Sequence, residues 1–313
     1  MGNQSLEYVT LDVFTQTRFA GNPLAVVKVP QSVSVTQEQK QRIAREFNYS
    51  ETTFIHERVE GGSQNHWTVD IFTKDREIPF AGHPTIGTAC FALGDLAKDT
   101  NTLTQGKFSI KAGPVDLVYE NKRASASIPH NVRLHQATLG VSDLYRIQPA
   151  LHTLKRNGQT DLSPEFPVFS IVKGMTFPLI QLPDLDALGA LSTGSEMADV
   201  ELDEGWCDLH GLCYYYVRLP ESEDGTVNLR TRLIKGILED PATGSAASAL
   251  TSFLSMQGKY AGGQKIKYCV TQGVEMGRKS EIRLTITMTE VGGIGNVTLE
   301  GSAVKVMEGR VYL

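Results

Sequence analysis

The sequence lacks most of the features that mark secreted, membrane or nucleic-acid-binding proteins. It has only 4 cysteines in 313 residues, with no Cys-x-x-Cys pair and no spacing typical of a zinc site. Lysine and arginine never occur three in a row, and the formal net charge is −5, so no basic nucleic-acid-binding face is indicated. No apolar run approaches the roughly 20 residues that a membrane-spanning helix needs. We therefore expect no nucleic-acid partner and no membrane partner.

Signals for targeting, metals and nucleotides are absent as well. The first residues, MGNQSLEYVT, show no basic segment followed by an apolar one, so no secretory signal is expected. The cysteines are best explained as buried thiols in a reducing cytosol, which predicts a cytoplasmic protein. The 7 histidines are scattered, and no phosphate-binding loop, dinucleotide fingerprint or Gly-x-Ser-x-Gly motif occurs. We therefore expect no metal and no cofactor.

The chain is instead rich in segments whose apolar residues alternate, as they do in β-strands. The predicted strands cover residues 7–14, 23–29, 66–72, 115–120, 166–172, 177–182, 212–219, 227–234, 266–271, 281–288 and 296–306. Helices are few. The clearest covers 36–49 and opens with a capping box formed by Thr36 and Gln39, and shorter ones are predicted at 141–147 and 184–191.

Two further helices, predicted to begin near Pro84 and Pro241, consist mostly of small residues. Proline is favoured in the first helical turn, and small residues on most faces indicate close packing inside a sheet. Both share the pattern Pro-x-x-Gly-[Ser/Thr]-Ala, about half a chain apart. We interpret this as an internal duplication. It predicts an α+β protein of two similar halves, residues 1–128 and 129–313, with the segment near 298–313 as a candidate to complete the first half.

This register places His83 before one proline and Asp240 before the other. If the halves pack about a pseudo-twofold axis, the two helix N-termini face each other across a cleft. Their unpaired N–H groups and positive dipole ends would then hold a small anion such as a substrate carboxylate. Taken singly, Asp240 is also explained as a helix N-cap and His83 as a structural histidine. Their matched positions favour the functional interpretation.

Two other polar residues stand out beside apolar strands. Glu51 lies at the entry to the apolar segment TTFI and shares a strand face with Thr53 and Ile55. A carboxyl group among apolar walls has a raised proton affinity, which suits acid/base catalysis; the alternative is an exposed glutamate at a strand end. Asn22 lies in the tight turn Gly21-Asn22-Pro23, either as its left-handed residue or as a ligand contact.

Several of these motifs together resemble one family. The segments DVFTQTRFAGNPLAVV, NYSETTFI, IFTKDREIPFAGHPTIGTA and GILEDPATGSAASAL are similar, in order and spacing, to the phenazine-biosynthesis PhzF-like proteins, and so is the closing GRKSEIRL…VTLEGSAVKVMEGRVYL. The resemblance covers essentially the whole chain. It implies a diaminopimelate-epimerase-like fold, with two α+β halves, each a sheet around a central helix, and an active site in the cleft between them.

The resemblance also implies a reaction and a set of site residues. The family's best-known member isomerises trans-2,3-dihydro-3-hydroxyanthranilate without a cofactor, moving a proton between two carbons of a small ring acid. By motif match, Glu51 is the acid/base. The other matched active-site residues are Gly82, His83, Asp240, Gly244 and Ser245. The related two-thiol epimerases carry a cysteine at each helix start, where this sequence has none, so a two-thiol mechanism is not expected. The resemblance further suggests a homodimer.

Three functional hypotheses follow for this sequence. The first is a cofactor-independent isomerase of a small cyclic or unsaturated carboxylic acid, with Glu51, His83 and Asp240 catalytic and Gly82, Gly244, Ser245 and Asn22 binding substrate. The second is a non-thiol epimerase or racemase of a small amino or hydroxy acid. The third is a non-catalytic protein that binds a small acid or a partner on the same fold, which has no need of a proton-shuttling glutamate.

Overall fold

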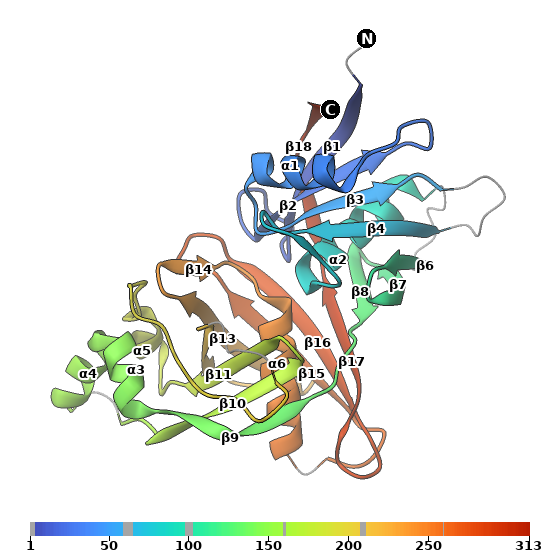
Figure 1. Ribbon diagram of the computed structural model, residues 1–313. Helices are drawn as coiled ribbons and strands as arrows, with labels where there is room; N and C mark the ends of the chain where they lie inside the picture. Colours follow the sequence, from blue (N-terminus) through green and yellow to red (C-terminus); the bar gives the residue numbers. More distant parts are fainter. Residues whose placement is uncertain (1–3, 59–64, 98–102, 159–160, 207–210, 259) are drawn as a thin grey trace. The chain divides into compact units, whose positions relative to one another are not determined.

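The computed structural model describes residues 4–58, 65–97, 103–158, 161–206, 211–258 and 260–313, which form two compact units (Figure 1). The first unit comprises Met1–Ile128 and Leu299–Leu313, and the second comprises Pro129–Thr298. In each unit strands surround one buried helix made largely of small residues. The α+β class and the central helices therefore confirm the predicted fold class.

In its described residues the first unit contains two α-helices, one π-helical segment and the strands that enclose them. The elements are β1 (Ser5–Val13), β2 (Asn22–Val29), α1 (Gln37–Phe47), β3 (Thr52–His56), β4 (His66–Phe72), β5 (Glu77–Ile78), α2 (Gly82–Phe91), η1 (Ala92–Leu96), β6 (Leu103–Ile110), β7 (Gly113–Glu120), β8 (Arg123–Ser127) and β18 (Ala303–Tyr312). β1 pairs antiparallel with β18 on one side and with β2 on the other. β2 pairs parallel with β3, which continues antiparallel into β4.

α2 is the central helix of this unit, and every residue from Gly82 to Phe91 is buried. It packs against β1, β2, β3, β7, β8 and β18. Small residues are required for this close approach. A Cβ atom on Gly87 would lie 2.6 Å from side-chain carbons of both Val13 and Leu24. The strand β3 therefore has helices on both faces, because Phe54 packs in the cluster that includes Ile43 of α1 while Thr53 contacts α2.

The described part of the second unit contains four helices and many strands. Its elements are β9 (Arg133–Gly140), α3 (Val141–Ile147), α4 (Pro149–Arg156), β10 (Glu165–Val172), β11 (Met175–Gln181), α5 (Leu185–Gly189), β12 (Cys213–Arg218), β13 (Val227–Lys235), β14 (Leu238–Asp240), α6 (Gly244–Gln257), β15 (Lys265–Gln272) and β16 (Ser280–Met288). β17 (Ile294–Gly301) contains residues of both units. The central helix α6 packs against β10, β11, β15 and β16.

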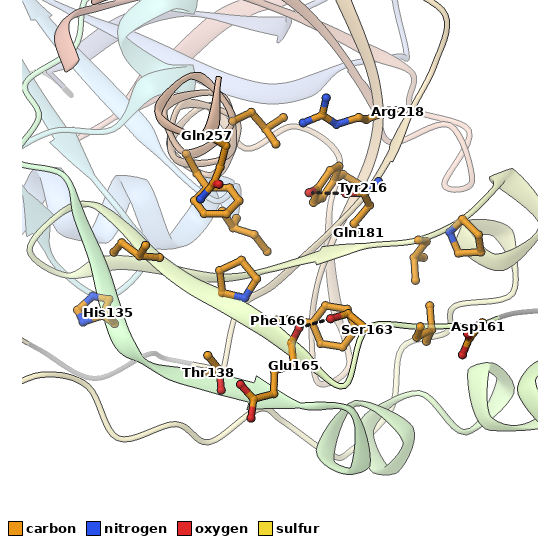
Figure 2. A pocket seen from close by; sticks show the side chains of 18 residues that line it. His135, Thr138, Asp161, Ser163, Glu165, Phe166, Gln181, Tyr216, Arg218 and Gln257 are labelled. Atoms are coloured by element: carbon orange, nitrogen blue, oxygen red, sulfur yellow. Dashed lines mark hydrogen bonds between the residues drawn. The ribbon is translucent and has the colours of Figure 1, made fainter. Parts of the chain in front are cut away.

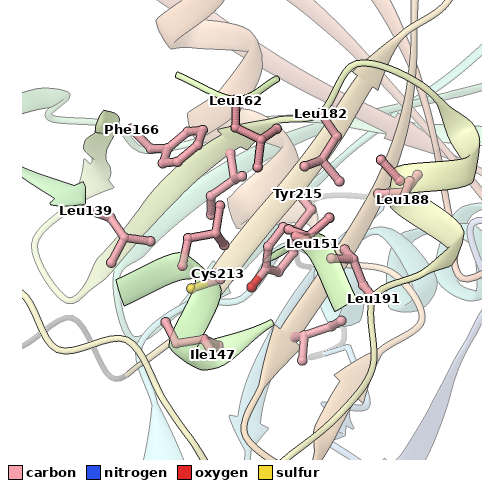
Figure 3. Close-up of a cluster of buried hydrophobic side chains, with 14 of the residues drawn as sticks. Leu139, Ile147, Leu151, Leu162, Phe166, Leu182, Leu188, Leu191, Cys213 and Tyr215 are labelled. Atoms are coloured by element: carbon pink, nitrogen blue, oxygen red, sulfur yellow. The ribbon is translucent and has the colours of Figure 1, made fainter. Parts of the chain in front are cut away.

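The three short helices of this unit share a hydrophobic cluster with one face of its strands (Figure 3). β12 shows how the two strand faces divide. Cys213, Tyr215 and Val217 belong to the cluster, whereas the intervening Tyr214 and Tyr216 direct their hydroxyl groups to polar partners elsewhere. This period of two is the pattern from which the strand was predicted.

Most predicted strands and helices are present, with three kinds of difference. The predicted strand 296–306 is broken at Ser302, where the backbone N–H of Phe14 donates to the Ser302 carbonyl at 2.7 Å. The sequence prediction missed β5, β6, β8, β9, β14 and α4. α2 begins two residues before Pro84, and α6 begins three residues after Pro241. Within the described residues, no helix is both long and apolar enough to cross a membrane.

Candidate active site

Glu51 and His83 are two predicted site residues that the structure brings into contact. Glu51 directly precedes β3, and His83 is the second residue of α2. The Glu51 Oε2 atom lies 3.2 Å from His83 Nδ1, and the side chains are 17% and 6% exposed. The pair is therefore largely shielded from water, and only a small part of the Glu51 side chain stays accessible.

Packing between β3 and α2 fixes this contact. The hydroxyl groups of Thr53 on β3 and Thr88 on α2 lie 2.9 Å apart, and Thr53 is fully buried. Because strand side chains alternate, Glu51 is on the same strand face as Thr53 and contacts the helix five residues earlier, at His83. The predicted shared face of Glu51 and Thr53 is therefore the face that meets α2.

Burial changes the acidity of Glu51. Desolvation raises the pKa of its carboxyl group from 4.5 to about 7, and a hydrogen bond with the Ser50 side chain offsets part of this effect. A carboxyl group with this pKa is present in both protonation states near neutral pH. It can accept a proton in one step and return it in another without assistance from a second base.

Asn22 lies at the first residue of β2, is 2% exposed, and stands opposite Val13 of β1 in the register. The suggestion that Asn22 is the left-handed residue of its turn is wrong. Gly21 has the positive φ of 68°, and a Cβ atom there would lie 2.3 Å from the Val13 carbonyl oxygen. Asn22 is therefore held by strand pairing, and the turn is made by the glycine before it.

Asp240 is in the second unit, at the last residue of β14 and ahead of α6. Its Oδ2 accepts a hydrogen bond from the Thr243 hydroxyl at 2.6 Å, and its Oδ1 accepts one from the Ala242 N–H at 3.3 Å. The N-cap of α6 is Thr243, so the explanation of Asp240 as the N-cap is wrong. Asp240 instead holds the short turn that leads into the helix.

Gln272, which the sequence analysis missed, is the centre of this turn. Its side-chain N–H groups donate to the Asp240 carbonyl at 2.8 Å and to the Thr243 hydroxyl oxygen at 3.1 Å. Its Oε1 accepts from the Thr243 N–H at 3.3 Å and from the Tyr214 hydroxyl at 3.1 Å. Gln272 is fully buried at the end of β15, so the amide fixes the turn in place.

One sequence signal for Gln272 was available in the glycine that follows it. Gly273 has a φ of 73°, and a Cβ atom there would lie 2.6 Å from the Pro241 carbonyl oxygen. Only glycine permits both the left-handed conformation and this close approach to the turn. The pair Gln272-Gly273 therefore marks where β15 touches the start of α6.

These contacts leave the start of α6 without a side-chain cap. Thr243 is an effective N-cap residue, but its hydroxyl bonds to Asp240 and Gln272, and no side-chain cap bond is formed. Gly244 and Ser245 are the first two residues of the helix, where backbone N–H groups point outward and the helix dipole favours negative charge. The arrangement suits a small anion.

The helix starts also revise the internal register. Counted from the first helical residue, Gly82 matches Gly244 and His83 matches Ser245. The predicted match of His83 with Asp240 is therefore wrong as a structural equivalence. The reason is that Pro84 lies within the first turn of α2, whereas Pro241 lies outside α6.

Glu239, the neighbour of Asp240, has a different environment. It forms a two-pronged ion pair with Arg232, with both nitrogen–oxygen distances 2.8 Å, and Arg232 also donates to the carbonyl groups of Leu188 and Leu191. Because β14 alternates, the side chain of Glu239 leaves the strand opposite that of Asp240. Glu239 thus stabilises the second unit, and only Asp240 serves the start of α6.

Among the described residues, no cysteine lies at the start of either central helix. Cys90 is at the C-terminal end of α2, and burial raises the pKa of its thiol to about 12. Burial likewise raises the pKa of the Cys213 thiol to about 12. Cys207 lies outside the described residues. The described part of the chain also holds no cluster of three His, Cys, Asp or Glu side chains arranged to bind a metal ion.

Comparison with known proteins identifies relatives over the full chain. Residues 11–309 match the family model described as phenazine biosynthesis-like protein. The trans-2,3-dihydro-3-hydroxyanthranilate isomerase of Pseudomonas fluorescens is 32% identical over 301 residues, covering 92% of this chain and 95% of that protein. An uncharacterized isomerase of Mesorhizobium japonicum is 30% identical over 325 residues, covering 99% of this chain and 100% of that protein.

Solved structures show the same fold. A PhzF-family phenazine biosynthesis protein of Bacillus anthracis superposes with a TM-score of 0.73 at 16% identity, covering 99% of this chain and 100% of the other. At this identity the likeness concerns the fold alone. It confirms the fold that the sequence motifs predicted.

Proposed function

Since the chain belongs to the phenazine biosynthesis-like protein family and is an isomerase, we propose that it moves a proton between two carbons of a small cyclic carboxylic acid. The substrate class is that of the P. fluorescens relative, trans-2,3-dihydro-3-hydroxyanthranilate or a close analogue. The reaction needs no cofactor, because one carboxyl group can both take and return the proton.

The protonation state of Glu51 is the observation that carries this proposal. Its pKa of about 7 and its partial exposure suit a group that exchanges protons with a substrate at neutral pH. A buried structural glutamate is normally paired with a lysine or arginine, and the side chain that Glu51 contacts is that of His83. A protein that only binds a ligand has no need of such a carboxyl group.

In the proposed reaction the Glu51 carboxylate removes a proton from a ring carbon activated by the neighbouring unsaturation. The electron pair of the broken C–H bond enters the conjugated system, and the double bond shifts. The carboxylic acid then returns the proton to another carbon, so the product is an isomer and Glu51 regains its charge. His83 Nδ1, 3.2 Å from Oε2, and the Ser50 side chain position the Glu51 carboxyl group for the substrate.

The remaining predicted residues have binding and positioning roles in this proposal. The N–H groups of Gly244 and Ser245 bind the substrate carboxylate, and Asp240 keeps the Thr243 hydroxyl engaged so that these donors are not capped. Gly82 occupies the matching first position of α2, where a side chain would obstruct an approaching ligand. Asn22 is proposed as a further polar contact to the substrate.

Two finer predictions from the sequence are part of the proposal. A cytoplasmic location follows from the cysteine usage, and a homodimer follows from the family resemblance. Fractionation of cells that express the chain and light scattering of the purified protein test them separately. Neither prediction affects the role of Glu51.

The deciding experiment is an NMR assay in D₂O with trans-2,3-dihydro-3-hydroxyanthranilate, comparing wild type with Glu51→Gln. The wild type should rearrange the substrate and exchange protons with solvent, whereas Glu51→Gln should fold normally and do neither. Turnover retained in Glu51→Gln contradicts the role of this residue.

Other outcomes distinguish the alternatives. Inversion of a stereocentre without migration of a double bond identifies an epimerase. Binding without exchange of any substrate proton identifies a non-catalytic binding protein. An asparagine variant of His83 serves as a second probe, because it keeps a polar side chain beside Glu51 but cannot titrate.

A further inference from the structure

The second unit contains a pocket that includes none of the proposed site residues (Figure 2). Its volume is about 720 Å³, within the range of small-molecule sites. It is lined from α6 by Phe253, Leu254 and Gln257, close to the C-terminal end of that helix. At 1.5 Å per residue, Phe253 lies about 12 Å along the helix axis from Ser245, so the pocket is separate from the start of α6.

The base of the pocket is apolar and rigidly packed. Phe166, Leu179 and Leu182 line it and are at most 2% exposed, and Phe253 and Leu254 are also buried. Phe166 and Leu182 belong to the hydrophobic cluster of this unit, so the base is part of the folded core. A ligand on this surface would gain from burial of an apolar ring or chain without first ordering a loop.

The rim of the pocket is polar, and its charges are divided. Figure 2 shows Arg218, Tyr216, Gln181 and Gln257 toward one side of the pocket and Glu165, Ser163 and Asp161 toward another. The Tyr216 hydroxyl donates to Gln181 Oε1 at 3.1 Å, which leaves the Gln181 amide N–H groups as donors. Arg218 is exposed and forms no ion pair within the described residues. One side of the rim thus offers donors and a positive charge.

We propose that this pocket binds a small monocarboxylate with an apolar body. Its carboxylate would pair with the Arg218 guanidinium and the amide of Gln181, and its apolar part would cover Phe166, Leu182 and Phe253. The carboxylates of Asp161 and Glu165 would repel a second negative charge at the far end, so the site selects monoanions over dianions. This proposal stands on the second unit alone and does not depend on the proposed reaction.

The test uses three probes of the same shape: 3-phenylpropionate, the uncharged 3-phenylpropanol and the cationic 3-phenylpropylamine. Each is titrated into the isotope-labelled full chain, and affinities and amide chemical-shift changes are followed by NMR. The carboxylate should bind at least about tenfold more tightly than the alcohol, since a charge-assisted pair to arginine contributes roughly that factor. The shifts should centre on Gln181, Tyr216 and Arg218.

Two variants sharpen the test. Arg218→Gln should weaken 3-phenylpropionate about tenfold and leave 3-phenylpropanol unchanged. Arg283→Gln removes an arginine of β16 outside the pocket and should change neither. The proposal is overturned by equal affinity of Arg218→Gln and Arg283→Gln, by tighter binding of the amine, by no binding to the wild type, or by shifts confined to Gly244 and Ser245.

Discussion

The two units have the same architecture at their centres but different chemistry where the central helices begin. α2 starts with Gly82-His83, and its second residue contacts a buried carboxyl group with a raised pKa. α6 starts with Gly244-Ser245, and the groups around it are hydroxyls, amides and the carboxylate of Asp240, joined by hydrogen bonds.

This difference shows how two units built around similar central helices can have different roles in the proposed reaction. A helix start provides N–H donors and a favourable field for negative charge in both units. In the first unit Glu51 and His83 are in contact at the helix start, and we propose that Glu51 transfers protons there. In the second unit the one good capping residue is held by Asp240 and Gln272, which favours anion binding. Three predictions test this division, and a fourth concerns the thiols.

The largest effect should come from removing, one at a time, the carboxyl groups of Glu51 in the first unit and Asp240 in the second. Glu51→Gln should lower kcat by at least about 100-fold, because general acid/base catalysis contributes that factor or more. Asp240→Asn keeps the shape of the turn and should mainly raise KM. Steady-state kinetics with the substrate of the P. fluorescens relative provide both parameters. A kcat loss in Asp240→Asn equal to that in Glu51→Gln would contradict the proposal that the first unit transfers the proton and the second binds the anion.

The next effect concerns stability, because the raised pKa of Glu51 makes folding depend on pH. The pKa of the Glu51 carboxyl group is about 7 in the folded protein, against 4.5 for an ordinary glutamate exposed to water, as in the unfolded chain. Between these values the folded state binds more protons than the unfolded state, so the free energy of unfolding falls as pH rises. The total fall is roughly 3 kcal/mol and is complete about one pH unit above the folded pKa, near pH 8.

Urea unfolding at about pH 5 and about pH 8 measures this contribution. In Glu51→Gln the free energy of unfolding should differ much less between the two pH values, because the amide does not titrate. Glu46→Gln, which replaces an exposed glutamate on α1 of the same unit, should retain it. An unchanged pH dependence in Glu51→Gln would show that the carboxyl group is not the source.

A smaller effect is expected from replacing Gln272, the buried amide that holds the turn before α6. Gln272→Leu removes the amide that bonds to the Asp240 carbonyl, to Thr243 and to the Tyr214 hydroxyl, and loss of buried hydrogen bonds costs about 1–3 kcal/mol. KM should rise about tenfold with little change in kcat, since 1.4 kcal/mol corresponds to that factor. Gln264→Leu is the matched control, because Gln264 accepts a backbone hydrogen bond from Ala261 in an exposed turn. A loss in kcat alone would place Gln272 with the proton-transfer residues.

Local patterns in the sequence predicted a large part of this structure. The Thr36–Gln39 capping box forms with both of its hydrogen bonds, and the alternating segments became strands. The same alternation placed Glu51 on the face of Thr53. These features depend on neighbours a few residues apart, which is the range over which side-chain periodicity and capping act.

The remaining features depend on partners far along the chain. Thr243, not Asp240, became the N-cap of α6, and its hydroxyl is engaged by Gln272, which is 29 residues away in sequence. Pro241 therefore gave a wrong prediction of where α6 begins, whereas Pro84 lies in the first turn of α2 as expected. Gln272 itself lies at the end of an ordinary strand, and only the left-handed Gly273 after it marks a close contact.

The smallest effect should come from a buried thiol. The prediction of buried cysteines is confirmed for Cys90 and Cys213, whereas Cys269 is only partly buried and Cys207 lies outside the described residues. Cys90→Ala should leave kcat and KM unchanged, because the thiol is buried, its pKa is about 12, and it lies at the opposite end of α2 from His83. Stability should fall by only about 1 kcal/mol, as expected for a small cavity in the core. Kinetics and urea unfolding on one preparation separate these two quantities. A tenfold loss of turnover in a folded Cys90→Ala protein would bring thiol chemistry back into the mechanism and weaken the assignment of both proton-transfer steps to Glu51.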